Sequence, residues 1–261
     1  MVREFNQPQD LVVEKLYNVG DSFATGVGLD EPKVDSYPVQ ISKAFDCKLI
    51  SLARPGCCNF SISLMIDWIV KHGGSMDTDF VLASTTNENR LCWPLPAIAI
   101  SEPTIEELNY NDYAHDLLTE LPFSPTNKLQ SETCSNILLY NKGGLPGNKA
   151  LNRDDKGRVE TLEKYITEIH DMEIKRRHDV NALIASLHRL NVITSAWCLI
   201  TTWWELHNEF PNNCITDLDF GKVSKRYPDK MGSGHFDRTG HRIISNRIEK
   251  WYNENMDTFK R

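Results

Sequence analysis

Short apolar runs alternate along the chain with longer segments in which apolar residues recur every three or four positions. The runs predict strands at 15–19, 48–53, 80–85 and 192–200, because a parallel strand covered on both faces is apolar almost throughout. The segments between them have the spacing of amphipathic helices. Strands that alternate with helices in this way predict an α/β fold with a parallel sheet.

Four segments show helical spacing. One helix is expected after Pro38, and a second is expected to begin at Asn59, whose side chain would act as its cap. A long helix is expected over 162–190 and a last one over 239–253, with Asp237 as the cap just before it. The predicted fold is a three-layer α/β/α sandwich with a central, mostly parallel sheet of the flavodoxin-like kind.

One domain is expected to span residues 1–261, because no Gly/Ser-rich or Pro-rich linker divides the chain. Six prolines and a Gly-Gly pair interrupt the stretch between about 91 and 157. That stretch is expected to be an insertion into the domain, with some helix at 105–121.

Charge and composition exclude several classes of protein. With 36 acidic and 29 basic residues the net charge is −7, which leaves no electrostatic basis for a nucleic-acid partner. No apolar run reaches the ~18 residues of a membrane helix, and residues 1–10 carry no signal peptide. We therefore expect a cytoplasmic protein without a membrane partner, and a virion-associated protein is the alternative. The seven cysteines lack metal-ligand spacing, so a metal site is not expected.

Chemically useful residues follow the predicted strands and precede the last helix. Ser22 stands in a turn after the first strand, Gly56 after the second and Asn87 after the third, while His235 lies in a glycine-flanked loop. Acyl transfer needs a nucleophile, a base and donors aimed at the oxyanion. Ser22 would be the nucleophile and His235 the base, with the Gly56 N–H and the Asn87 amide as donors.

Each of these residues also has a simpler interpretation. Ser22 could cap a helix, Gly56 could serve a turn, Asn87 could be a loop residue and His235 a surface histidine. The cysteine pair that follows Gly56 could supply a thiol nucleophile, although packing in the core is the simpler interpretation. Trp203 and Trp204 could line a sugar or acyl pocket, or they could pack in the core. The joint order of the first four residues favours a single site.

That order resembles the SGNH (GDSL-like) hydrolase family. The first block of the family is matched by Gly20-Asp21-Ser22, and the second by Gly56 as an oxyanion donor. The third block is filled by Thr85-Thr86-Asn87-Glu88, in which Asn87 fits while Thr85 and Glu88 depart. His235, followed five residues later by Gly240-His241, fits the last block. The resemblance covers 15–90 and 191–253 and implies an SGNH-like sandwich.

The chain departs from the family at the acid that normally precedes the histidine by three residues. Gly232 stands in that place, and the nearest carboxylate upstream is Asp229. The acid fixes the imidazole tautomer, and its loss can cost about 10⁴ in rate. Either Asp229 or a backbone carbonyl replaces it, or the enzyme is slow or inactive. His241 is expected to be structural.

The resemblance implies a serine esterase that cleaves an acyl or acetyl ester, one on a carbohydrate included, without metal or organic cofactor. Ser22, His235 and Asp229 would be its catalytic residues. A weak or inactive SGNH-like domain that binds a saccharide or a protein is the alternative, and a phage structural protein would be one form of it. Nothing in the sequence indicates an oligomeric state.

Overall fold

Five parallel strands form the central sheet of the computed structural model, in the order β2-β1-β3-β6-β7. They are β1 (Lys15–Val19), β2 (Lys48–Ser51), β3 (Asp79–Ser84), β6 (Trp197–Ile200) and β7 (Cys214–Ile215). The structure describes residues 12–53, 57–73, 78–88, 90–94, 134–138, 164, 168, 171–232 and 234–259.

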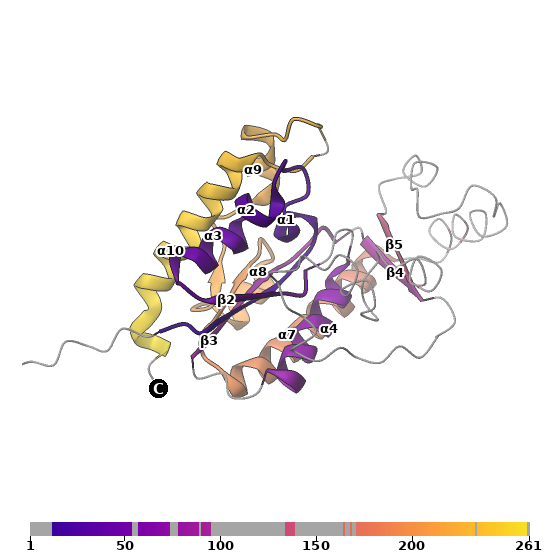
Figure 1. The fold of residues 1–261 in the computed structure, drawn as a ribbon. Helices are drawn as coiled ribbons and strands as arrows, with labels where there is room; N and C mark the ends of the chain where they lie inside the picture. The colour runs from indigo at the N-terminus through magenta and orange to yellow at the C-terminus, as the bar shows by residue number, and fades with distance from the viewer. Residues whose placement is uncertain are drawn as a thin grey trace, which may run out of the picture.

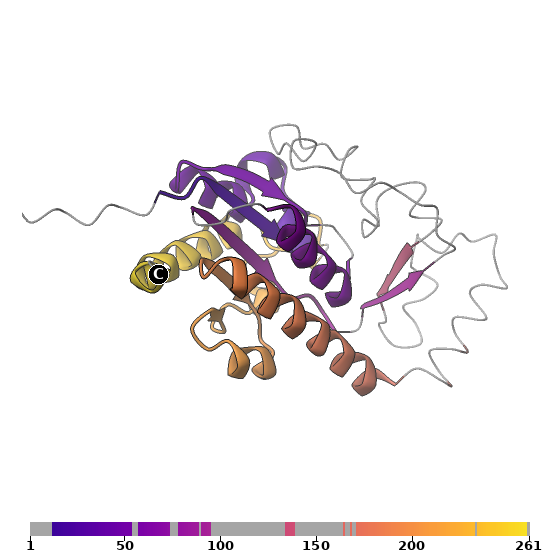
Figure 2. The ribbon, with the colours of Figure 1, turned by 90° about the horizontal axis from the view of Figure 1, so that it is seen from below.

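Helices cover both faces of this sheet (Figures 1 and 2). Side chains alternate along β1, so that Tyr17 and Val19 pack on one face while Leu16 packs on the other. The first face is covered by α4 (Asn59–His72), α7 (Met172–Ile193) and α8 (Trp204–Glu209), and the second by α3 (Tyr37–Ala44) and α10 (Arg238–Phe259). The predicted three-layer α/β/α sandwich is confirmed.

The sheet has one point at which the order of its strands reverses. From β1 the chain runs outward to β2 and then returns past β1 to β3, so the crossovers beside β1 and β3 leave in opposite directions. In open α/β sheets ligands bind at the carboxyl ends of the strands next to such a point. The residues after β1 and β3 are therefore those best placed for a site.

The predicted elements agree with the structure in kind and differ at some ends. The first strand is confirmed at Lys15–Val19, but the strand expected from 192 begins only at Trp197, because the helix before it continues to Ile193. The expected cap at Asn59 is wrong. Asn59 is the first helical residue of α4, Cys58 is the N-cap position, and no side chain caps the helix there.

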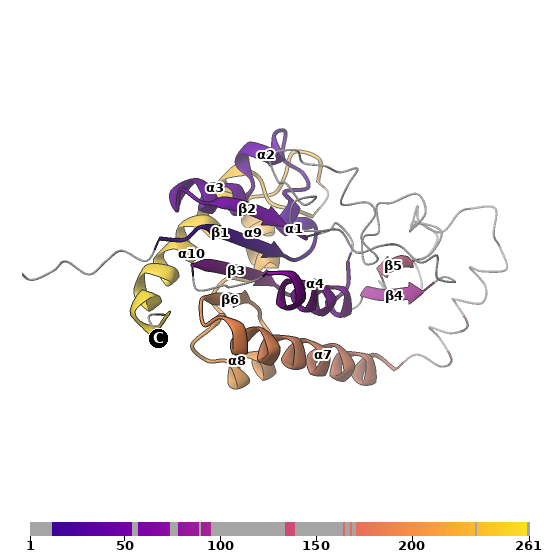
Figure 3. The ribbon, with the colours of Figure 1, turned by 60° about the horizontal axis from the view of Figure 1, so that its bottom comes forward.

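A separate antiparallel pair, β4 (Arg90–Pro94) with β5 (Cys134–Leu138), lies beyond the carboxyl ends of the main strands (Figure 3). It falls almost entirely within the stretch expected to be an insertion. The helix expected at 105–121 lies outside the described residues. In the part of the chain that the structure describes, no helix combines the length and the apolar character needed to span a bilayer.

Candidate functional site

A tight turn at the end of β1 presents Ser22. The strand ends at Val19, Asp21 is the N-cap of the short helix α1 (Ser22–Thr25), and its carboxylate accepts from the Phe23 N–H at 3.0 Å. Position 20 favours glycine, because its backbone passes close to Ser84 and a side-chain carbon there would lie 2.3 Å from Oγ of Ser84. Ser22 is thus the first residue of the helix, and Asp21 does the capping.

Ser22 and His235 meet across the fold. The Nε2 atom of His235 lies 2.7 Å from Oγ of Ser22, a hydrogen bond between residues 213 positions apart. Ser22 is buried, while His235 is half-buried and its ring packs on that of Phe23 at 4.9 Å between centroids. With Nε2 unprotonated, the serine hydroxyl donates and the imidazole accepts, which is the arrangement a general base requires.

Asp229 lies opposite His235 in a short two-segment ribbon. Pro228 and Phe236 form an antiparallel bridge, and the Asp229 N–H donates to the carbonyl of His235 at 3.1 Å. In this register the side chains of residues 229 and 235 leave the same face of the ribbon. Asp229 is buried, and its carboxylate packs against Gly28. The residue that carries the nearest upstream carboxylate is therefore paired with His235 through the backbone.

Asn87 follows β3 and is exposed, and the residue before it is tightly held. The Thr86 N–H donates to Oδ1 of Asn59 at 2.8 Å, and Nδ2 of Asn59 donates to the Thr86 carbonyl at 3.0 Å. The Thr86 hydroxyl donates to Oδ2 of Asp21 at 2.6 Å. These three bonds fix the end of β3 against α4 and against the turn that carries Ser22.

The resemblance also singled out two further positions, Gly56 and Gly232. Gly56 lies outside the described residues. Gly232, where the resemblance would lead one to expect an acid, has φ of +63° and is exposed, with nothing within 4 Å of the point where a side-chain carbon would stand. A carboxylate at 232 would be strained and would have no packing partner within that distance, so Asp229 is the better placed group.

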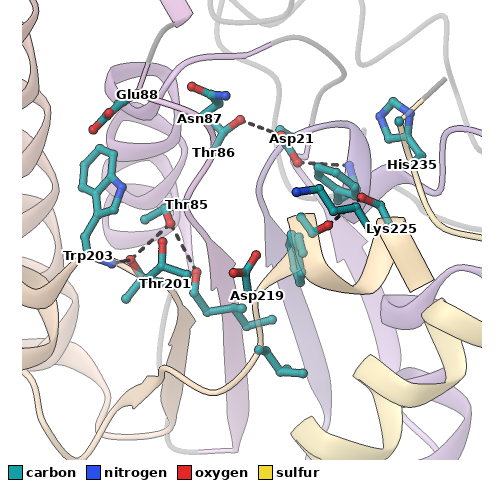
Figure 4. A pocket seen from close by; sticks show the side chains of 18 residues that line it. Asp21, Thr85, Thr86, Asn87, Glu88, Thr201, Trp203, Asp219, Lys225 and His235 are labelled. Carbon is teal, nitrogen blue, oxygen red and sulfur yellow. Dashed lines mark hydrogen bonds between the residues drawn. The ribbon is translucent and has the colours of Figure 1, made fainter. Parts of the chain in front are cut away.

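A cavity of about 680 Å³ opens along the carboxyl ends of the strands (Figure 4). The lining comes from the ends of β1, β3 and β6 and from the region of α9 (Phe220–Arg226) and the His235 loop. Asn87 and His235 both line it, as do Asp21 and Phe23 on either side of Ser22. Three of the predicted site residues, Ser22, Asn87 and His235, are thus at or beside one cavity.

Arg176 of α7 joins the residues that form the cavity wall opposite His235. Its guanidinium contacts the carboxylates of Glu88 at 3.2 Å and Glu205 at 2.7 Å, and it lies 5.7 Å from the centre of the Trp203 ring. Glu88 and Trp203 line the cavity on the side facing away from His235 (Figure 4). Trp203 is therefore both packed and part of the wall, whereas the side chain of Trp204 is exposed.

His241 is a structural residue in this arrangement. It is fully buried, and its Nδ1 accepts the N–H of Tyr37, the first residue of α3, at 3.1 Å. Burial lowers the pKa of His241 to about 3, and the neighbouring His235 contributes in the same direction. Asp237 caps α10 as expected, since its carboxylate accepts the N–H of Gly240 at 2.9 Å.

Sequence reasoning missed Asn59, Thr86 and Arg176 as members of the site. Asn59 carried a signal, because a polar residue just after the second strand can reach the neighbouring strand end, but it was assigned to capping. Arg176 carried none, since it lies in a basic stretch typical of an exposed helix face. The two cysteines after Gly56 are buried, and Cys57 donates to the Gly20 carbonyl at 3.2 Å.

A scan against protein-family models, a search of curated proteins and a search of solved structures found no match to this chain. Among the described residues, no three His, Cys, Asp or Glu side chains are grouped so that they could hold a metal ion.

Proposed function

We propose that this protein is a serine hydrolase of the SGNH type that cleaves a carboxylic ester, acyl or acetyl, with carbohydrate esters included. The observation that carries the proposal is the 2.7 Å contact between Oγ of Ser22 and Nε2 of His235. It occurs where the strand order reverses, next to a cavity large enough for a small ester.

In the proposed reaction, Ser22 Oγ attacks the ester carbonyl while His235 Nε2 takes the hydroxyl proton. The imidazolium then gives this proton to the leaving alcohol, and an acyl-enzyme remains. Water attacks the acyl-enzyme, with His235 again as base, and releases the acid and free Ser22. The Asn87 amide would donate to the oxyanion of each tetrahedral intermediate, together with the Ser22 and Gly56 N–H groups that the resemblance implies.

Asp229 would orient the imidazole. For Nε2 to accept from the serine, the ring must carry its proton on Nδ1, and a carboxylate near Nδ1 favours that tautomer. The position of Asp229 opposite His235 supports this role.

Covalent labelling tests the proposal. A fluorophosphonate probe is expected to label Ser22 in the wild type, and an aryl acetate is expected to be hydrolysed. Ser22→Ala should lose labelling and at least about 10³-fold in kcat. Ser42→Ala is the matched control, because the hydroxyl of the buried Ser42 donates to the Val39 carbonyl within α3, away from the cavity.

A folded wild type that neither reacts with the probe nor turns over the ester would refute hydrolase activity. If such a protein bound a saccharide, and Ser22→Ala bound it equally well, the chain would instead be a binding domain built on the same fold.

A further inference from the structure

A line of buried polar side chains leads from α7 to the strand end that carries Asn87. Asn59 is fully buried, and its amide pairs with the backbone of Thr86 through both its oxygen and its nitrogen. The Asn59 amide thus makes the two hydrogen bonds to Thr86 that a residue of a neighbouring strand would make. The height of the next residue, Asn87, above the sheet therefore depends on the amide of Asn59.

Asp179 determines which way that amide points. Asp179 of α7 is buried beside Asn59, and the Asn59 side chain acts to lower the pKa of its carboxyl, which favours the charged form. An ionised carboxylate only accepts, so it requires the NH₂ group of Asn59 on its side. The second N–H then points to the Thr86 carbonyl, and the amide oxygen is left for the Thr86 N–H. A reversed amide would lose both bonds to Thr86 and would turn its oxygen toward the Asp179 carboxylate.

Lys175 favours the charged form of Asp179. Burial raises the pKa of Asp179, and the ammonium of Lys175 beside it acts against that rise. The two side chains form an ion pair one helical turn apart on α7, and both are largely buried. The Asp179 carboxylate that orients Asn59 is thus paired with a lysine of the same helix, α7.

We propose that Lys175, Asp179 and Asn59 form a positioning unit that sets Asn87 at the height from which its amide donates to the oxyanion. This inference rests on the hydrolase function proposed above. None of the three residues is placed in contact with substrate, so each is a positioning residue. Their loss is expected to lower kcat with little change in KM, because the oxyanion forms only in the transition state.

Asn59→Asp is the most informative variant. A protonated carboxyl has an oxygen that accepts and a hydroxyl that donates, so it can make both bonds to Thr86. Once ionised, it faces the Thr86 carbonyl and a second carboxylate, and the pairing fails. Two carboxylates that share a site retain one proton to a raised pH. The described charged or titratable groups around them are Lys175 and His178 on α7 and, beyond Thr86, Asp21.

The measurement is the ratio of kcat in Asn59→Asp to kcat in the wild type, from about pH 5 to about pH 8. The ratio cancels the titration of the catalytic groups. It should be near one at the acid end and fall about 10- to 100-fold at the alkaline end, with KM unchanged. Asn59→Ala should be low throughout. Asn181→Asp adds the same charge to the exposed face of α7 and should match the wild type.

A ratio that stays constant with pH, or an Asn59→Ala variant with wild-type kcat, would overturn the proposal. If Asn59→Asp does not fold, Lys175→Met/Asp179→Leu tests the same unit without an unpaired charge. It should lower kcat about tenfold at constant KM, and wild-type kcat in it would also overturn the proposal.

If the wild type hydrolyses no ester, the hydrolase function fails but the positioning unit is still tested. Protection of the Thr86 amide against hydrogen exchange should then be lost in Asn59→Asp as the pH rises, after correction for the intrinsic exchange rate. Unchanged protection would refute the unit.

Discussion

Gly28 and Asp229 lie so close together that any side chain at position 28 would overlap the Asp229 carboxylate. A side-chain carbon on Gly28 would lie 2.4 Å from Oδ2 of Asp229, and Gly28 has φ of +93°. The loop after α1 therefore packs directly against the buried Asp229 carboxylate. Because Asp229 pairs with His235 through the backbone, a change at this glycine acts directly on the neighbour of the residue that carries the imidazole.

Gly28→Ala should displace the Asp229 carboxylate. We expect a loss of about 3 kcal/mol in unfolding free energy, from the left-handed backbone and the steric overlap together. If Asp229 orients His235, kcat should fall about 10- to 100-fold, because small misplacements of catalytic groups are costly. Urea unfolding and ester turnover measure the two effects.

Gly232→Ala separates backbone strain from displacement. It also places alanine at a positive φ, +63°, but its side-chain carbon would meet nothing within 4 Å. It should cost only about 1 kcal/mol and leave kcat near the wild-type value. Equal effects of the two substitutions on kcat would show that the position of Asp229 does not matter for the reaction.

The fold could be predicted from the sequence because each strand face is buried. The face of β3 that carries Val81 packs under α4 and α7, and the face that carries Phe80 packs under α3 and α10. A strand covered on both sides is apolar throughout, and that is a strong signal. The strand Cys214–Ile215 was missed because two residues are too few to form a pattern.

The site could be predicted only in part. Ser22, Asn87 and His235 occur in the order that the SGNH resemblance led us to expect, and their convergence at the strand ends follows from a parallel sheet. The contacts that hold them do not, because they depend on which side chains point into the same space. Asn59 paired with Thr86, and Gly28 against Asp229, are packing relationships between distant segments. No local spacing encodes such contacts.

Lys175→Met should destabilise the protein by about 3–5 kcal/mol at neutral pH, since it leaves the buried Asp179 charge unpaired. Lys175→Met/Asp179→Leu should recover most of that loss, because it removes both charges. Burial already raises the pKa of Asp179, and loss of Lys175 raises it further. The defect of the single variant should therefore shrink as the pH is lowered and Asp179 takes up a proton.

Urea unfolding of the wild type, the single variant and the double variant at two pH values measures these differences in stability. A single variant as stable as the wild type would show that the ion pair contributes nothing. A double variant less stable than the single one would show that packing, rather than charge, determines stability here.

Arg176→Met should loosen the cavity wall. Arg176 joins Glu88, Glu205 and Trp203, which come from two strand ends and α8. Its loss should raise KM several-fold at nearly constant kcat, because the wall contacts the ground state and the transition state alike. Arg177→Met removes only an exposed pair with Glu173 and should change neither constant. A fall in kcat without a change in KM would place Arg176 in the chemistry instead.

Stability should depend on pH through His241, whose pKa is lowered from 6.5 to about 3 by burial. Between these values the unfolded chain binds a proton that the folded protein does not, so the unfolding free energy falls as the pH falls. This contribution to stability is fully present above about pH 6.5, and the loss reaches roughly 4–5 kcal/mol by about pH 3. His241→Asn retains an acceptor for the Tyr37 N–H and should flatten this dependence. His188→Asn, which replaces an exposed ring on α7, should leave it unchanged. If the slope between these pH values survived in His241→Asn, another buried group would have to be responsible, and His241 would be no more than a packing residue.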